Sequence, residues 1–406
     1  MNYPPVSFAS HCECTREEHW ALLGDLTVLV FTRDRPKEVE RLLKSLSRFP
    51  CFVDVYDNGS EPLPQGLRAF FSKQSYTYRA GHWGHNLMTA ASQLRTDFVC
   101  LVDDDGLLQP YGAASALCRL HRDIELSAVE GHFANFVVRG GRAVLLKGTE
   151  LAPGAALEAD PIDRWRSVLQ GFSETQYYSI YRSSLFALTF GFSANVELIA
   201  TSRNVSPPLF VAMTAAHGPI GRSPILVTLR EDSLPSHNKL AMDLWIGDWL
   251  ADDQYKSEVV EVLSITRQSL TLLGMSVGDA DRAISIFLET QERRAHVQPT
   301  IKTGPLAAIA RVTRPLRNRI REGRPSPSEE RDLQDFREKQ VITLAELNVL
   351  TSPTILDLGA IRWDSTDAQQ TLLALEVDEG IAVDRPRDLR SQAYFHSRQT
   401  GVRSQS

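Results

Sequence analysis

Three consecutive carboxylates, Asp103, Asp104 and Asp105, follow the apolar run 98–102. An unbroken apolar run bounded by polar residues is typical of a strand that is buried on both faces. Three adjacent acids repel one another and are costly to bury unpaired, so we expect them at the carboxyl edge of a sheet, where α/β proteins bind ligands. Such a density of oxygen ligands suits Mg²⁺ or Mn²⁺. The alternative is a solvated acidic turn that caps the next helix.

A β-α-β unit that precedes the aspartates is expected to position further polar groups beside them. The apolar run 26–31 ends at Thr32 and Arg33, a helix is predicted from Pro36, and a short strand over 52–56 ends at Asp57. The carboxyl ends of parallel strands share one edge of a sheet. A basic residue and a carboxylate at that edge could hold the phosphates and base of a nucleotide. Loop residues that only cap helices are the alternative.

A glycine-containing loop over 81–86 opens the next predicted helix, 87–94. Such a loop offers backbone N–H groups to an anion, although no lysine follows it as in a phosphate-binding P-loop.

The order of these motifs resembles the nucleotide-binding half of family-2-like glycosyltransferases with the GT-A fold. The resemblance covers residues 25–240, with a nucleotide-binding half over 25–122 and an acceptor half over 123–240. It implies an α/β fold with a mixed, mostly parallel sheet flanked by helices. The implied activity is transfer of a sugar from a nucleotide-diphosphate donor, with a UDP-sugar expected, to a glycan, lipid-linked or other hydroxyl acceptor. The implied cofactor is Mn²⁺ or Mg²⁺.

The resemblance also assigns roles to individual residues. Asp105 would be the main metal ligand, and Asp103 would contact the ribose or a metal-bound water. His237 would complete the metal shell or contact the diphosphate, and Arg230 would lie on its phosphate side. The remaining donor-binding residues would be Asp57 on the base, together with Thr32, Arg33, Gly81, Asn86 and Asp104.

The base that deprotonates the acceptor is less sharply defined. Residues 173–181 are predicted as a strand, followed by one helix over 182–190 and a second from Ser193 through Arg203. Glu197 stands near the start of the second helix, where the resembling family places a catalytic carboxylate. Glu231 and Asp232 are the alternatives. A base at this place implies inversion of the anomeric configuration.

Composition narrows the class of protein. The chain has 406 residues, a net charge of −6, no apolar run near the roughly 18 residues that cross a bilayer, and no secretory signal pattern. Because the net charge is negative, we do not expect a general nucleic-acid-binding protein. Five cysteines, an odd number, favour reduced thiols and a cytoplasmic location.

Segments outside the resemblance are predicted as an N-terminal extension over 1–24, a helical extension over 241–323, and a linker, helix and loosely ordered tail over 324–406. The arginine-rich stretch 307–321 is expected to make peripheral contact with the inner face of a membrane, with a solvated basic surface as the alternative.

Two other functions fit parts of the same pattern. Residues 102–107 resemble the Asp-x-Asp-Gly motif of haloacid-dehalogenase-type phosphatases, in which Asp103 would be a nucleophile and Asp105 an acid/base. Two β-α units precede the motif, however, and Leu107 replaces the expected threonine. The non-enzymatic alternative is a sugar-nucleotide-binding assembly module that lacks a base.

Overall fold

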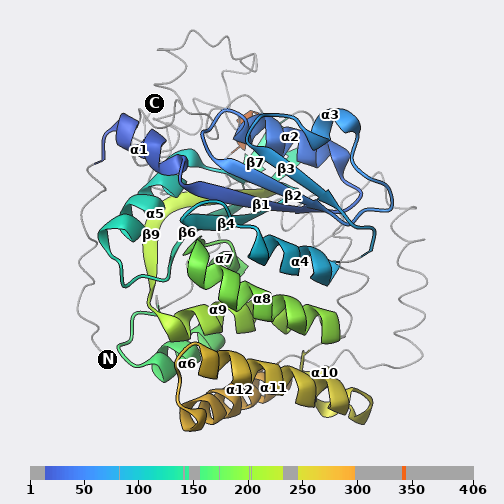
Figure 1. The fold of residues 1–406 in the computed structure, drawn as a ribbon, viewed down its shortest axis with the longest axis vertical. Helices are drawn as coiled ribbons and strands as arrows, with labels where there is room; N and C mark the ends of the chain where they lie inside the picture. Colours follow the sequence, from blue (N-terminus) through green and yellow to red (C-terminus); the bar gives the residue numbers. More distant parts are fainter. Residues whose placement is uncertain are drawn as a thin grey trace, which may run out of the picture.

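A computed structural model describes residues 14–81, 83–139, 142–145, 156–172, 174–200, 202, 204–231, 246–297 and 341–343. Within them a ten-stranded mixed sheet lies between two layers of helices (Figure 1). The predicted α/β class, with a mixed sheet flanked by helices, is confirmed.

The N-terminal strands form the parallel part of the sheet. Their order is β3-β2-β1-β4, with β1 at Leu26–Thr32, β2 at Phe52–Asp57, β3 at Gln74–Tyr78 and β4 at Phe98–Asp103. In β1, Val28 and Val30 pack into one core, whereas Leu29 and Phe31 pack into the other. Both faces are covered, which is why every residue of this strand is buried and nearly all are apolar.

One helical layer covers the first face of this sheet. It comprises α1 (Arg16–Leu23), α2 (Pro36–Leu46), α3 (Gln65–Arg68) and α5 (Pro110–Arg122). In α2, Val39, Leu42, Leu43 and Leu46 are fully buried at helical spacing, and Pro36 occupies its first turn.

The C-terminal strands extend the sheet beyond β4. They are β5 (Gly106–Leu108), β6 (Ala128–Arg139), β7 (Arg142–Leu145), β8 (Ile180–Arg182), β9 (Ile220–Glu231) and β10 (Val341–Thr343). β8 pairs antiparallel with both β4 and β6, and β9 runs parallel to β6 and antiparallel to β5. The β5–β9 pairing places Arg230 opposite Gly106, directly after the three aspartates.

The second helical layer covers the other face. It contains α4 (Trp83–Ser92), α6 (Pro161–Gly171), α7 (Glu174–Tyr177), α8 (Ser183–Ile199), α9 (Ser206–His217), α10 (Ile246–Ala251), a 3-10 turn (Asp253–Tyr255), α11 (Lys256–Leu272) and α12 (Val277–Val297). Trp165 of α6 is fully buried, and its indole N–H donates to the carbonyl of Ala283 in α12 at 2.8 Å. The predicted helices after residue 241 thus share a core with α6, α8 and α9. None of the described helices is long and apolar enough to span a membrane.

Four local predictions were wrong. Residues 174–177 form α7 rather than a strand, because Tyr177 and Tyr181 pack on Phe210 from a turn of helix. The two helices expected over 182–203 are the single helix α8, because Phe190 and Ala194 continue one buried stripe. Residues 341–343, expected to be helical, pair with β7. Reduced thiols were expected, and Cys14, Cys51 and Cys100 carry reduced thiols, whereas Cys118 is disulfide-bonded. Residues 307–321 lie outside the described residues.

Glu130 on β6 makes the stability of the folded state depend on pH. Its side chain is completely buried, accepts a hydrogen bond from Thr175 Oγ1 at 2.6 Å, and lies 3.5 Å from Arg222 Nε. Burial raises the pKa of Glu130 above its ordinary value, although Thr175 and Arg222 oppose the shift. The folded state therefore keeps a proton that the unfolded state releases, and stability falls as pH rises from the unfolded pKa, about 4.3, to the raised one.

We expect Glu130→Gln to remove the part of the stability loss at rising pH that comes from the ionisation of Glu130. Denaturant unfolding of both proteins across that pH window should show the wild type losing stability relative to the variant as pH increases. Parallel pH profiles would contradict the assignment.

Candidate active site at the carboxyl edge of the sheet

The register of the parallel strands brings three chemically active strand ends to one edge. Thr32 of β1 pairs with Asp57 of β2, and Phe31 pairs with Asp103 of β4. The predicted convergence of these strand ends on one rim is therefore present.

Asp104 is held beneath this rim. Its carboxylate accepts hydrogen bonds from Thr32 Oγ1 and from Arg35 Nη1, each at 2.9 Å, and the residue is 6% exposed. Burial is the main cause that raises the pKa of Asp104 to about 7; the Asp105 and Asp103 charges add to it, whereas Arg35 and Thr32 oppose it. Asp104 therefore anchors Arg35 and the end of β1 rather than facing solvent.

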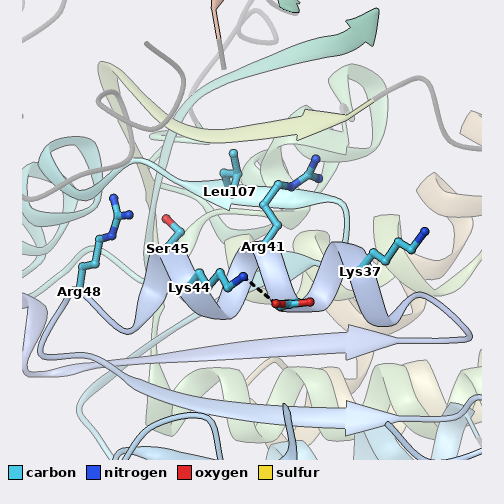
Figure 2. Close-up of a pocket in the computed structure, with 7 residues that line it drawn as sticks. Lys37, Arg41, Lys44, Ser45, Arg48 and Leu107 are labelled. Atoms are coloured by element: carbon cyan, nitrogen blue, oxygen red, sulfur yellow. Dashed lines mark ion pairs between the residues drawn. The ribbon is translucent and has the colours of Figure 1, made fainter. Parts of the chain in front are cut away.

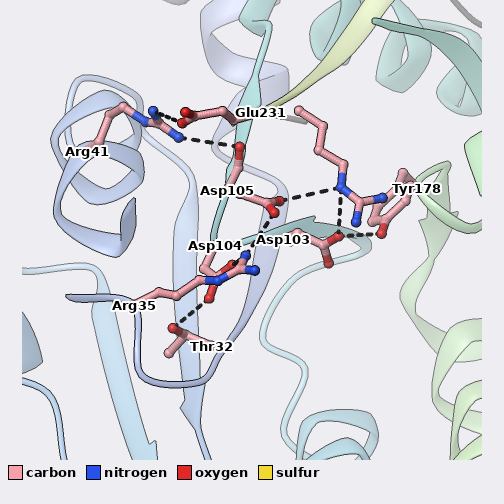
Figure 3. Close-up of polar contacts among 9 residues, drawn as sticks. Thr32, Arg35, Arg41, Asp103, Asp104, Asp105, Tyr178 and Glu231 are labelled. Carbon is pink, nitrogen blue, oxygen red and sulfur yellow. Dashed lines mark hydrogen bonds and ion pairs between the residues drawn. The ribbon is translucent and has the colours of Figure 1, made fainter. Parts of the chain in front are cut away.

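Asp105 is surrounded by arginines. Its Oδ2 accepts from Arg35 Nη1 at 2.8 Å, its Oδ1 lies 3.6 Å from Arg230 Nε, and its backbone carbonyl accepts from Arg41 Nη2 at 3.4 Å (Figure 3). Burial and the neighbouring Asp103 raise the pKa of Asp105, while Arg230 and Arg35 lower it. Its Oδ1 is buried and accepts no hydrogen bond from the described part of the chain.

Asp103 is the most accessible of the three. Its side chain is 34% exposed, and its Oδ2 accepts a hydrogen bond from Tyr178 at 2.5 Å and lies 3.8 Å from Arg230 Nε. Tyr178, which follows α7, stacks on Phe133 at 5.4 Å, so its ring is fixed by packing. Asp103 and Asp105 thus both face one point, at which Arg230 Nε lies.

Two converging carboxylates fit a hard divalent cation. Mg²⁺ and Mn²⁺ in phosphate sites are commonly held by one or two carboxylates, with phosphate oxygens and waters completing the shell. Asp105 Oδ1, buried without a hydrogen-bond donor, offers one ligand atom, and Asp103 offers a second. Among the described residues no group of three or more potential ligands forms, and His237 lies outside that part of the chain.

Asp57 has a fully engaged carboxylate. Its Oδ1 accepts from Gly59 N at 2.9 Å, and its Oδ2 accepts from Leu63 N at 3.0 Å and Tyr76 OH at 2.7 Å. Asn86 on α4 donates to the Asp57 carbonyl at 3.3 Å. These contacts shape the loop after β2, whereas the predicted contact of Asp57 with a nucleobase stays a prediction. Gly81 has a φ of +68°, and nothing lies within 4 Å of the position that a Cβ would take. Its backbone N–H donates to the carbonyl of Asn58 at 3.2 Å and closes this loop.

Arg35, rather than Arg33, reaches the aspartates. Arg33 is half exposed and lies 3.8 Å from Asp34. Asp34 has φ +56°, a left-handed conformation that aspartate tolerates, and its Oδ1 accepts from Ser60 N at 2.7 Å. This bend turns the chain so that the following residue points into the site. The sequence analysis did not identify Arg35, Arg41 or Tyr178 as site residues. Of the three, only Arg35 has a local signal, which is its short distance in sequence from the end of the first strand.

The candidate catalytic bases Glu197 and Glu231 lie on different elements, α8 and β9. Glu231, the last residue of β9, is 8% exposed and forms an ion pair with Arg41 at 2.5 Å. Glu197 is near the end of α8, not at a helix start as expected. In the same last turn of α8, Leu198 approaches Gly84 of α4. Burial raises the pKa of Tyr177 well above its ordinary value, and the charges of Glu197 and Asp103 add to that shift. Asp232 lies outside the described residues.

Tyr178→Phe tests how much the phenol contributes to positioning Asp103. The variant loses one hydrogen bond to a partly exposed carboxylate but keeps the ring stack on Phe133. We expect the free energy of unfolding to change by less than about 1.5 kcal/mol and any turnover to fall by about 3- to 10-fold. Denaturant unfolding and steady-state kinetics would check both values, and a loss of several hundred-fold would mean that the phenol itself takes part in the reaction.

Comparisons with known proteins find distant structural similarity. TarS 1–349 from S. aureus shares 16% identity over 68% of this chain and 93% of its own, with a TM-score of 0.37. A longer TarS structure shares 16% identity over 66% of this chain, which spans 55% of that protein, with a TM-score of 0.38. The mannosyltransferase PcManGT from Pyrobaculum calidifontis, in complex with GDP-Man and Mn²⁺, shares 14% identity over 71% and 80% of the two chains, with a TM-score of 0.32.

These structural neighbours are glycosyltransferases. No family model and no curated protein sequence matches the chain. At this distance, the function must be inferred from the chain's own residues.

Proposed function

We propose that this protein is a metal-assisted glycosyltransferase that moves a sugar from a nucleotide-diphosphate donor, a UDP-sugar in the first instance, to a hydroxyl acceptor with inversion. One observation supports this most strongly: Asp103 and Asp105 converge beside Arg230, at the edge where β1 and β2 also end. That edge is where open α/β sheets bind nucleotides.

The arginines suit a leaving diphosphate. Arg230 is 28% exposed at its side chain and lies within 4 Å of both Asp103 and Asp105, so it is placed to exchange carboxylate contacts for phosphate oxygens. Arg35 is 12% exposed and stays bound between Asp104 and Asp105, so it holds the rim rather than the ligand. Guanidinium groups match phosphate geometry in a bidentate manner.

A divalent cation held by Asp103 and Asp105 would neutralise charge that develops on the leaving diphosphate. The chain's own residues prepare this site. Tyr178 orients Asp103, and Arg35 fixes one oxygen of Asp105 while its Oδ1 remains without a hydrogen-bond donor.

For the acceptor, Glu197 is our proposed base. Glu231 is already engaged in an ion pair with Arg41. Glu197 shares the surroundings of Tyr177 with Asp103. As the base, Glu197 would deprotonate an acceptor hydroxyl as it attacks the sugar. The acceptor, membrane contact and cytoplasmic location stay proposals.

Thermal unfolding with ligands tests this function. The wild type should gain about 2–5 °C with a saturating UDP- or GDP-sugar plus Mn²⁺, and much less with either ligand alone, because the cation and diphosphate complete each other's coordination. A scan of nucleotide bases would name the donor. Equal stabilisation by nucleotide with and without Mn²⁺ would contradict the metal-assisted mechanism, and no response to any nucleotide would contradict the proposed function.

A further inference from the structure

A second polar site lies on the α2 face, behind the three aspartates. A pocket of about 340 Å³ is lined by Lys37, Glu40, Arg41, Lys44, Ser45, Arg48 and Leu107 (Figure 2). All but Leu107 come from α2 or the turn that follows it, and Leu107 belongs to β5. The nucleotide-site residues Asp103, Asp104 and Arg35 do not line this pocket.

The pocket is locally basic on an acidic protein. Among the described residues, the four cations of the row have two carboxylate partners, Glu40 beside Lys44 and Glu231 beside Arg41, so positive charge is in excess by two, whereas the whole chain carries a net charge of −6. Glu40 pairs with Lys44 at 2.6 Å, and that lysine is 59% exposed. Lys37 and Arg48 are exposed at the two ends of the row. An unbalanced positive row of this kind attracts anions and raises their local concentration.

The cations repeat along the helix axis. They stand at positions 37, 41, 44 and 48, on one side of α2, and the helical rise separates successive ones by about 4.5–6 Å. A single phosphate would meet one or two of them. A linear anion with a charge every few ångströms would meet the exposed Lys37, Lys44 and Arg48 in turn, with Arg41, which is paired with Glu231, between them.

The lining also argues against two other ligands. Leu107 is the sole apolar residue of the lining and is 2% exposed, so a lipid surface would find no apolar side chain to contact. Among the residues that the structure describes, no aromatic side chain lines the pocket, so nucleic-acid bases find no stacking platform there. Lysine and arginine heads are good partners for phosphate oxygens.

Arg41 joins this pocket to the candidate active site. Its guanidinium lines the pocket and also contacts Glu231 and the carbonyl of Asp105 (Figure 3). We propose that the pocket, which we term the α2 groove, binds a linear chain of repeated phosphate groups without bases, next to but separate from the nucleotide site.

The binding experiment uses inorganic polyphosphate and the full chain in EDTA, which excludes metal-dependent binding at Asp103 and Asp105. The test variant is Lys37→Gln/Lys44→Gln/Arg48→Gln, which leaves Arg41 and the three aspartates intact. The matched control is Lys256→Gln/Arg282→Gln, two exposed cations on the distant helices α11 and α12. Titration calorimetry at two salt concentrations gives the affinity and its salt dependence, and a thermal melt confirms that each variant is folded.

We expect the triple variant to bind polyphosphate at least about tenfold more weakly than the wild type, with a shallower salt dependence, while the control changes less than about twofold. Vesicles with and without phosphatidylglycerol form a second arm. Equal polyphosphate affinity in the triple variant and the wild type would overturn the proposal. So would binding to anionic vesicles together with no binding to polyphosphate, because that result would assign the groove to a lipid headgroup.

Discussion

Asp105→Asn should abolish metal-dependent donor binding and reduce sugar transfer by about 10³-fold, because one of two ligand carboxylates then lacks its charge. The fold should survive. Burial and the neighbouring Asp103 raise the pKa of Asp105, so its charge is unfavourable in the folded state, and an amide of the same shape removes that cost. Arg35 keeps its hydrogen bond to Asp104.

The matched control is Asp25→Asn. This aspartate immediately precedes β1, at the opposite edge of the same sheet, and its side chain is 53% exposed. Donor binding by calorimetry with Mn²⁺ and turnover should be unchanged in the control. An Asp105→Asn variant that is folded and still binds the donor in a manganese-dependent way would show that the cation lies elsewhere.

Asp57→Ala has the second large expected effect, and it acts on stability. Three buried or half-buried donors, from Gly59, Leu63 and Tyr76, end on this carboxylate. Removing the acceptor leaves Gly59 N and Tyr76 OH without this partner, and Leu63 N keeps only its hydrogen bond to the Tyr76 hydroxyl at 3.0 Å. We expect the free energy of unfolding to fall by at least about 2 kcal/mol. Denaturant unfolding measures the change directly.

Tyr76→Phe calibrates that loss, because it removes one of the three hydrogen bonds to Asp57, while Leu63 N loses its contact with the phenol but still donates to Asp57. It should cost about 1 kcal/mol. If Asp57→Ala keeps wild-type stability but loses nucleotide affinity, the carboxylate serves the base and not the loop. That outcome would restore the role that the family resemblance gave to Asp57.

The parallel half of the sheet could be predicted because its signals are local. Apolar runs that end in Thr32, Asp57 and Asp103 identify buried strands, and parallel pairing then requires their polar ends to meet. This inference needs no information about contacts between distant parts of the chain, which is why the edge of the sheet that carries the site could be predicted.

Arg41 and Tyr178 could not be predicted, because distant parts of the chain bring them to the site. Arg41 meets Glu231 across 190 positions, and Tyr178 meets Asp103 across 75. Their positions depend on the β5–β9 pairing and on α7, neither of which has a clear periodic pattern. Glu197 shows the same limit: local propensity suggested a helix start, whereas packing of α8 on α4 extends the helix through it.

Anomalous diffraction at the manganese edge, from crystals grown with UDP and Mn²⁺, tests the central proposal most directly. We expect one manganese peak within about 2.0–2.6 Å of carboxylate oxygens from Asp103 and Asp105 and of the diphosphate, with the Arg230 side chain displaced from between the two aspartates. A bound nucleotide with its diphosphate on the arginines, and no manganese between Asp103 and Asp105, would contradict it.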